Sequence, residues 1–286
     1  MKKNLLVAAL LTAAATGAMA QSVTVNNLKT QSLNEVGLTV STYKYSEPNL
    51  TDLTGNTMTV TSKATNIGLE YLGTYSLKND WFLLAEVDYN NGNVTYNGSG
   101  TASGIPQYYY NLKGAAGYDF GFNGFVLSPY VGLGYRYLSQ ALGGVTTSTG
   151  ARGYDRQSTY NYIPIGVIHR MNINTKSILV TTLEYDYLIS GSQYSGLSAL
   201  NGTSGGVTYA GIPNATNTQN SGYGVNLSVM YKEDKWGVGP YLKYWNISQS
   251  DTVYGNFTRN GVAYRGGVLE PANNTIEYGV KGIYRF

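Results

Sequence analysis

Residues 272–286 read Ala-Asn-Asn-Thr-Ile-Glu-Tyr-Gly-Val-Lys-Gly-Ile-Tyr-Arg-Phe. From Tyr278 to Phe286 every second residue is aromatic, aliphatic or glycine, and charged residues such as Lys281 and Arg285 stand between them. Successive side chains of a β-strand point to opposite faces of the sheet. The alternation therefore predicts a strand with one apolar face and one polar face.

The same alternation recurs along most of the chain. Ile67, Leu69 and Tyr71, for example, alternate with Gly68 and Glu70. Such segments are typical of half-buried strands, so the sequence predicts an all-β chain. We expect ten strands, over residues 34–45, 62–76, 81–92, 105–120, 124–138, 157–171, 177–190, 218–232, 236–249 and 272–286.

The connections between these segments alternate between short and long, and this indicates a membrane barrel. An outer-membrane β-barrel has short turns on one side, long loops on the other and an aromatic girdle near each end. Trp81 and Trp236 flank short turns, while Tyr108 and Tyr187 lie nearer the long loops. A soluble sandwich needs no such alternation. The sequence predicts a ten-stranded antiparallel transmembrane β-barrel, with eight or twelve strands as alternatives.

The composition agrees with a barrel and excludes other classes. Charged residues make up 12% of the chain, about half of what soluble domains carry. The 28 tyrosines suit the boundary between lipid and water, where an amphipathic ring is favoured. The chain has no cysteine, which excludes a disulfide scaffold.

The beginning of the chain predicts export. Two lysines precede the apolar run Leu5–Ala15 and the small-residue sequence Ala18-Met-Ala20. This order is that of a secretory signal peptide over residues 1–20, and the run is shorter than the roughly 18 residues of a transmembrane helix. We expect a short periplasmic segment over 21–33 and the barrel over 34–286. Removal of the signal peptide takes away two lysines and lowers the net charge from +3 to +1. A nearly neutral chain gives no reason to expect a nucleic-acid partner.

The final strand resembles the C-terminal signature of bacterial outer-membrane barrels, which ends on an aromatic residue. Tyr284 and Phe286 carry this resemblance, and they imply recognition by the barrel-insertion machinery. Residues 240–247 and 271–280 are similar to segments of small proteobacterial barrel proteins of the porin-like or surface-barrel type. The resemblance implies a location in the outer membrane of a Gram-negative bacterium.

Strand parity predicts which charged side chains enter the barrel. The inward set balances seven acids with seven bases, which favours mutual pairing because an unpaired charge out of water is costly. Ten strands lie close to the size at which side chains fill a barrel. We therefore expect a largely salt-bridged lumen, with a small passive porin-like pore as the alternative. The set is Glu70, Glu86, Asp88, Lys113, Asp119, Arg136, Arg170, Glu184, Asp186, Lys232, Lys243, Glu277, Lys281 and Arg285.

Three prolines fall well inside expected strands, away from the first two residues, although proline cannot donate to a β-ladder. They are Pro129, Pro164 and Pro240. A closed barrel offers no free edge to accommodate them. Each is therefore expected at a bulge, or in a strand shorter than the alternation suggests.

Catalysis is not expected, despite the acid pairs at Glu86/Asp88 and Glu184/Asp186. The omptin proteases, which are also ten-stranded barrels, use an Asp pair together with an Asp–His pair near the outer rim. The one histidine of this chain, His169, precedes a short turn and has outward parity. It cannot serve an omptin or a Ser–His mechanism, and no cysteine or histidine cluster suggests a metal. We expect no enzyme activity, no metal and no cofactor.

The long loops are the expected place for any binding role, since a barrel scaffold positions them. Arg152, Asp155 and Arg156 cluster in one loop, and Lys44 ends the first strand on its outward side. Basic groups there can pair with phosphates of lipopolysaccharide. The sequence thus predicts an integral barrel with five long surface loops and a structural or loop-mediated role. Its expected partners are lipid, lipopolysaccharide, the insertion machinery and an extracellular ligand of unidentified kind.

Overall fold

The computed structural model describes residues 28–51 and 57–286. The expected signal peptide, residues 1–20, and its cleavage site therefore lie outside the described residues. Within the two described ranges, no helix is long and apolar enough to cross a membrane.

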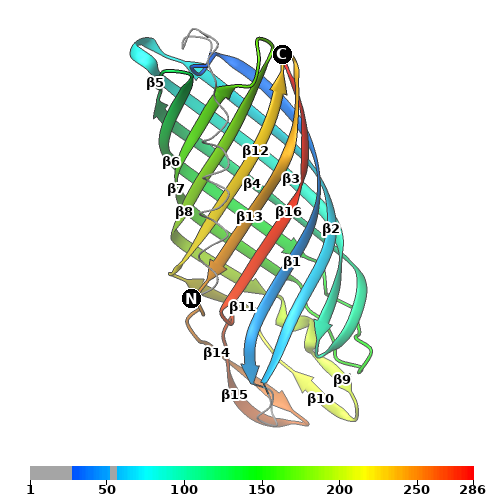
Figure 1. The fold of residues 1–286 in the computed structure, drawn as a ribbon. Coiled ribbons are helices and arrows are strands. Elements are labelled where there is room, and N and C mark those ends of the chain that lie inside the picture. The colour runs from blue at the N-terminus through cyan, green and yellow to red at the C-terminus, as the bar shows by residue number, and fades with distance from the viewer. Residues whose placement is uncertain (1–27, 52–56) are drawn as a thin grey trace.

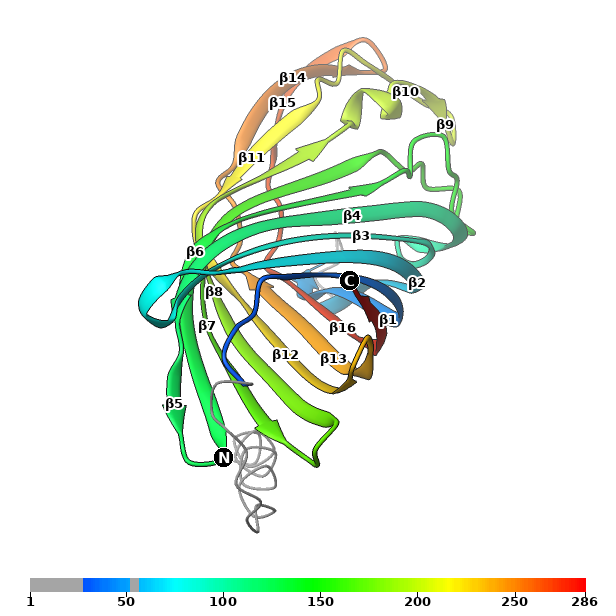
Figure 2. The ribbon, with the colours of Figure 1, turned by 90° about the horizontal axis from the view of Figure 1, so that it is seen from above.

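The chain forms a closed antiparallel barrel, seen from the side in Figure 1 and along its length in Figure 2. Each barrel strand pairs with the strand before it and the strand after it, and β1 closes the ring by pairing with both β2 and β16. The predicted ten-stranded barrel is confirmed, and the alternatives of eight and twelve strands are wrong. The barrel strands are β1 (Leu33–Thr51), β2 (Thr57–Ser76), β3 (Trp81–Gly98), β4 (Gly100–Tyr118), β6 (Phe125–Gln140), β7 (Arg156–Asn172), β8 (Ser177–Ser195), β12 (Gly222–Glu233), β13 (Trp236–Ile247) and β16 (Asn273–Arg285).

Two short strands continue barrel strands in the same register. β5 (Phe120–Phe122) follows β4 along β6, and β11 (Ala215–Gln219) precedes β12 along β8. The sheet therefore contains twelve strand segments, but β5 and β11 only lengthen existing barrel strands, and the ring still has ten strands.

The barrel has two different ends. At the turn end, residues 77–80, 123–124, 173–176 and 234–235 join neighbouring strands, and Phe286 also lies there (Figure 1). At the loop end, 141–155, 196–221 and 248–272 form long connections. Residues 46–51, 57–61 and 93–104, which lie between expected strands, are instead largely strand, because β1 to β4 run on past the lipid-facing residues.

A second, four-stranded sheet lies beyond the loop end. β9 (Gly202–Ser204) and β10 (Val207–Ala210) come from one long connection, and β14 (Val253–Arg259) and β15 (Val262–Val268) come from another. The sheet order is β15-β14-β10-β9. Two loops that are far apart in the sequence therefore fold together into one surface sheet. The local sequence patterns did not predict this sheet.

The polarity of the barrel wall is inverted relative to a soluble protein. Leu38, Ile67, Leu69 and Leu133 are each at least 60% exposed on the outer face. Carboxylates such as Glu184 are buried inside. An outward apolar band with a polar interior is the arrangement that a bilayer requires of a β-barrel.

The three prolines expected at bulges, Pro129, Pro164 and Pro240, do not behave as expected. At all three prolines the ladder to one neighbouring strand is interrupted, yet its register is the same on both sides of the gap. Near Pro164 a bulge does occur, but the extra residue is Ile189 on the adjacent β8. A bulge at each proline is thus wrong. Proline removes a single N–H donor, so the ladder opens locally without needing an inserted residue.

Two tyrosine rings cover glycines between β6 and β7. Tyr130 lies opposite Gly166, and Tyr162 lies opposite Gly134. A methyl group on either glycine would overlap the ring of the facing tyrosine. The absence of a side chain is thus what allows both rings to lie flat against the inner wall.

We predict that Gly166→Val destabilises the barrel by about 1–3 kcal/mol, because the new side chain displaces the Tyr130 ring and overpacks the wall. Gly114→Val is the matched control, since a methyl group there meets no atom within 4 Å. The urea midpoint of the micelle-refolded protein is the measurement. Equal midpoints for the two variants would contradict this account of the ring packing.

Candidate functional site: the charged lumen

The first layer of lumen charges lies at the turn end. Glu35 accepts hydrogen bonds from Lys232 at 2.8 Å and from Arg285 at 3.2 Å. Glu35 on β1 thereby connects to the last strand and to β12. Sequence reasoning missed Glu35, although its parity matches that of the inward residues Thr39 and Tyr43.

Asp119 organises the other side of this layer. Its carboxylate accepts hydrogen bonds from Ser128 and from Arg170, the latter at 3.4 Å. It also accepts the backbone N–H of Thr30 at 2.6 Å. Leu28, two residues before Thr30, is also buried. The bonds from Thr30 to Asp119 and the burial of Leu28 together hold the residues before β1 against the turn end of the barrel.

Ion pairs continue into the middle of the lumen. The Lys281 ammonium lies 2.6 Å from Glu70. Lys113 on β4 lies 3.1 Å from Glu86 on β3 and 2.9 Å from Glu184 on β8. One ammonium group thus joins members of both acid pairs across the barrel.

Asp88 is the centre of a neighbouring network. Lys243 lies 3.0 Å from its carboxylate, and the amides of Asn90 and Asn111 donate to it at 3.1 and 2.8 Å. Arg136 donates in turn to the Asn111 carbonyl oxygen at 3.3 Å. The Asp88 carboxylate is therefore well satisfied although it is almost completely buried.

Two inward carboxylates, among the described residues, have no lysine or arginine within ion-pair distance. Glu277 accepts hydrogen bonds from the hydroxyls of Tyr109 and Tyr241. Asp186 accepts one from the Asn226 amide at 2.7 Å through Oδ2, while its Oδ1 has no hydrogen-bond partner in the described part of the chain.

A cavity of about 190 Å³ occupies the turn-end half of the lumen. Its lining begins with Leu28 and Arg285 at the turn end and reaches Asp186 and Trp245 in the middle of the barrel. Most of the paired charges described above line it.

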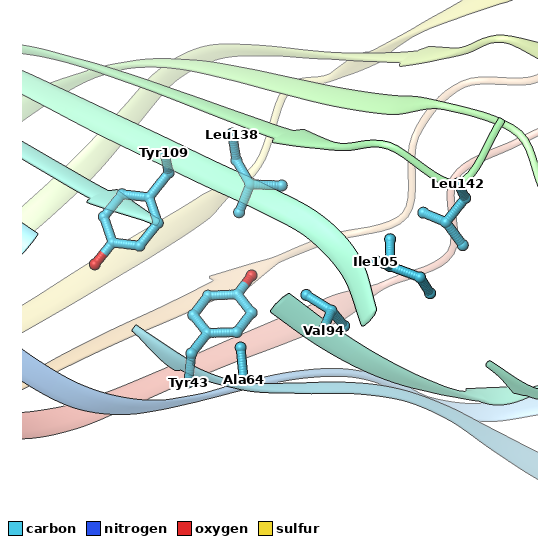
Figure 3. Packing of buried hydrophobic residues seen from close by; sticks show 7 residues of the cluster. All are labelled: Tyr43, Ala64, Val94, Ile105, Tyr109, Leu138 and Leu142. Atoms are coloured by element: carbon cyan, nitrogen blue, oxygen red, sulfur yellow. The ribbon is translucent and has the colours of Figure 1, made fainter. Parts of the chain in front are cut away.

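The loop-end half of the lumen is filled by side chains instead. Figure 3 shows one cluster, in which the rings of Tyr43 and Tyr109 stack at 6.3 Å beside the aliphatic side chains. A second cluster contains Tyr160 and Trp245. The Arg136 guanidinium lies 4.4 Å from the centroid of the Tyr109 ring and 5.8 Å from that of Trp245, so it joins the two clusters.

A third group of charges closes the loop-end rim. Arg156 was expected in a loop, but it begins β7 and points inward, where it pairs with Glu47 at 2.8 Å and with Glu270. Burial raises the pKa of the Glu270 carboxyl, and the Arg156 charge opposes this. Asp155, the expected neighbour of Arg156 in a surface cluster, instead accepts the backbone N–H of Gly143.

The remaining candidate residues lie on the outer wall. Tyr284 and Phe286 are exposed at the turn end, where Phe286 exchanges backbone hydrogen bonds with Asn34. His169 packs against Phe125, with ring centroids 5.5 Å apart. Within the described residues, no group of three potential ligands could hold a metal ion.

We predict that Lys113→Met destabilises the barrel by about 3–5 kcal/mol, because it leaves Glu86 and Glu184 buried without their shared cation. Adding Glu184→Gln should recover part of the lost stability, since it removes one of the two carboxylate charges left without a cation. Urea unfolding of the two variants measures both effects. An unchanged midpoint for Lys113→Met would contradict the importance of this ion-pair bridge.

Comparison with known proteins places this geometry in a family. The autotransporter β-domain family model matches residues 22–242. The outer membrane protease OmpT from Escherichia coli has a similar structure, with a TM-score of 0.55 at 10% identity over 90% of this chain and 97% of that one. The transport unit of the Escherichia coli autotransporter AIDA-I matches with a TM-score of 0.38 at 13% identity, over 97% of this chain and 96% of that one.

None of the curated proteins compared with the chain matches it. At 10% identity the OmpT similarity shows the fold alone, whereas the family match spans well over half of the chain. The expected bacterial outer-membrane barrel and its location in the Gram-negative outer membrane are confirmed. The chain is an integral outer-membrane β-barrel that belongs to the autotransporter β-domain family.

Proposed function

We propose that this barrel is a closed, non-enzymatic surface protein that acts structurally or through its loops. The observation that carries the proposal is the packed loop-end half of the lumen, where Arg136 joins the Tyr109 and Trp245 clusters. In this proposal the turn end lies on the periplasmic side of the outer membrane and the loop end lies on the outside of the cell. The inward charged residues predicted from the sequence as structural or pore-lining then have a structural role, most of them as ion pairs.

The surface sheet supports an interaction role. Tyr254, Val262 and Tyr264 are each at least 46% exposed on it, and Arg265 lies 5.1 Å from the centroid of the Tyr254 ring. Aromatic and arginine side chains are enriched where proteins bind partners. The extracellular ligand would therefore contact this unit rather than the barrel wall.

The placement of the acid pairs argues against an enzyme. Glu86 and Glu184 are bound to Lys113, and Asp88 is bound to Lys243. His169 is on the outer wall beside Phe125, so it cannot act with either pair. The OmpT similarity concerns the fold and assigns no protease activity to this chain.

A passive pore is the second candidate, and the cavity favours it. Its lining already extends through half of the lumen and carries charges of both signs. The loop-end clusters, and beyond them the Arg156 rim, separate it from the outside. A pore would need those clusters to move apart.

We expect the refolded wild-type protein to show no channel steps in a planar bilayer, because the loop-end clusters block a water path. The double variant Tyr109→Ala/Arg136→Ala should conduct, since it removes the contact between the clusters. Tyr108→Ala, on the outer wall, is the matched control. Steady wild-type conductance whose ion selectivity changes with Lys243→Gln would support the pore instead.

Lipopolysaccharide is the partner that the outer wall fits best. Lys44 and Lys63 are exposed and lie directly opposite each other on β1 and β2, toward the loop end from the apolar band. Like charges at such positions repel each other and destabilise a sheet. A phosphate between the two ammonium groups would convert this repulsion into attraction.

We predict that Lys44→Gln/Lys63→Gln weakens binding of lipopolysaccharide by about 1 kcal/mol per lysine. Retention on immobilised lipopolysaccharide in mild detergent measures the effect. Lys78→Gln, in a turn at the opposite end, should leave retention unchanged. Equal retention of the double variant and the wild type would contradict this partner assignment.

A further inference from the structure

Asp186 is the most unusual acid of the lumen. Its side chain is completely buried and lines the cavity, and its Oδ1 atom has no partner among the described residues. The Asn226 amide donates to Asp186 and also to Glu184, at 2.7 and 2.9 Å. Two carboxylates are therefore held side by side, but only Glu184 has a cation.

The middle of the lumen carries an excess of negative charge. Between the Glu35/Asp119 layer and the Arg156 rim, the described side chains include two more acids than bases. The acids are Glu70, Glu86, Asp88, Glu184, Asp186 and Glu277, and the bases are Lys113, Arg136, Lys243 and Lys281. A buried charge without a counter-charge is costly, so this region is suited to take up a cation.

The wall beside Asp186 is aromatic. Asp186 on β8 and Trp245 on β13 lie on either side of Gly224, whose missing side chain leaves room for both. A Cβ at Gly224 would lie 2.8 Å from Asp186 Oδ2 and 3.0 Å from Trp245 Cε2. Tyr162 packs edge-on against Trp245, with ring centroids 5.3 Å apart. Cations are attracted to the faces of such rings.

We propose that the cavity is a binding site for a small organic cation with a primary ammonium group. The ammonium N–H donates to the free Oδ1 of Asp186, and the aliphatic part packs against Trp245 and Tyr162. The cavity of about 190 Å³ equals the volume of about six water molecules, which limits the ligand to a few carbon atoms. The ligand enters from the turn end, where the cavity lining begins.

Fluorescence of Trp245 provides a direct test. The chain has three tryptophans, and Trp81 and Trp236 are exposed on the outer wall. The variant Trp81→Phe/Trp236→Phe therefore leaves Trp245 as the single reporter inside the lumen. Titration of the full refolded protein with n-butylammonium chloride should change its emission saturably. Equal concentrations of n-butanol, sodium butyrate and sodium chloride should not.

Asp186→Asn in this background is expected to weaken n-butylammonium binding at least tenfold. Glu277→Gln is the matched control, because it removes the same charge from a carboxylate that is also without a lysine or arginine but lies outside the cavity lining. Its affinity should stay within about twofold to threefold of the parent. Heat-modifiable gel migration verifies that each variant is folded.

Gly224→Ala gives a second test should Asp186→Asn fail to fold. Its methyl group enters the space between Asp186 and Trp245 and should weaken binding by a similar factor. The proposal is overturned if n-butylammonium gives no saturable change, which would mean that protons balance the excess charge. It is equally overturned if n-butanol binds as well, or if Glu277→Gln weakens binding as much as Asp186→Asn.

Discussion

The hydrogen bonds between β1 and β16 are the interaction on which the rest of the molecule depends. In hydrocarbon, every backbone N–H and C=O must find a partner within the protein, because no water is present. An open sheet of ten strands would leave two edges unpaired. The twelve residue pairs between Glu35–Ser46 and Asn274–Arg285 remove both edges at once. Closure of the ring is therefore a condition for the fold, and the interior exists as a consequence.

Closure also determines where charge can go. The outer wall faces lipid, so the polar half of each alternating strand must point inward. The charges are then confined to a narrow space, where each is stabilised mainly by the others. Lys113 shows the result, since it contacts carboxylates that come from two separated strands. The lumen thus resembles a core in which ion pairs and small apolar clusters pack together on its turn-end side.

The alternation of apolar and polar residues was sufficient to predict the fold, because a period of two residues can be recognised within each strand separately. It placed all ten strands and the inward side of Glu70, Glu184 and Lys281. It could not say which charges meet, since Lys113 and Glu184 are joined only after the ring closes. Arg156 was assigned to a loop because a local pattern does not reveal that β7 begins at that residue. The second sheet was invisible for the same reason, as β10 and β14 come from different loops.

The two halves of the lumen follow from the same geometry but suit different tasks. At the loop end, bulky residues such as Tyr43 and Tyr160 fill the ring, and Arg136 links their clusters. At the turn end long charged side chains lie among two smaller apolar clusters, and a cavity remains between them. A closed outer half allows loops to display a surface without opening the membrane. The inner half keeps the cavity, and its unbalanced carboxylates are the groups to which the proposed ligand would bind.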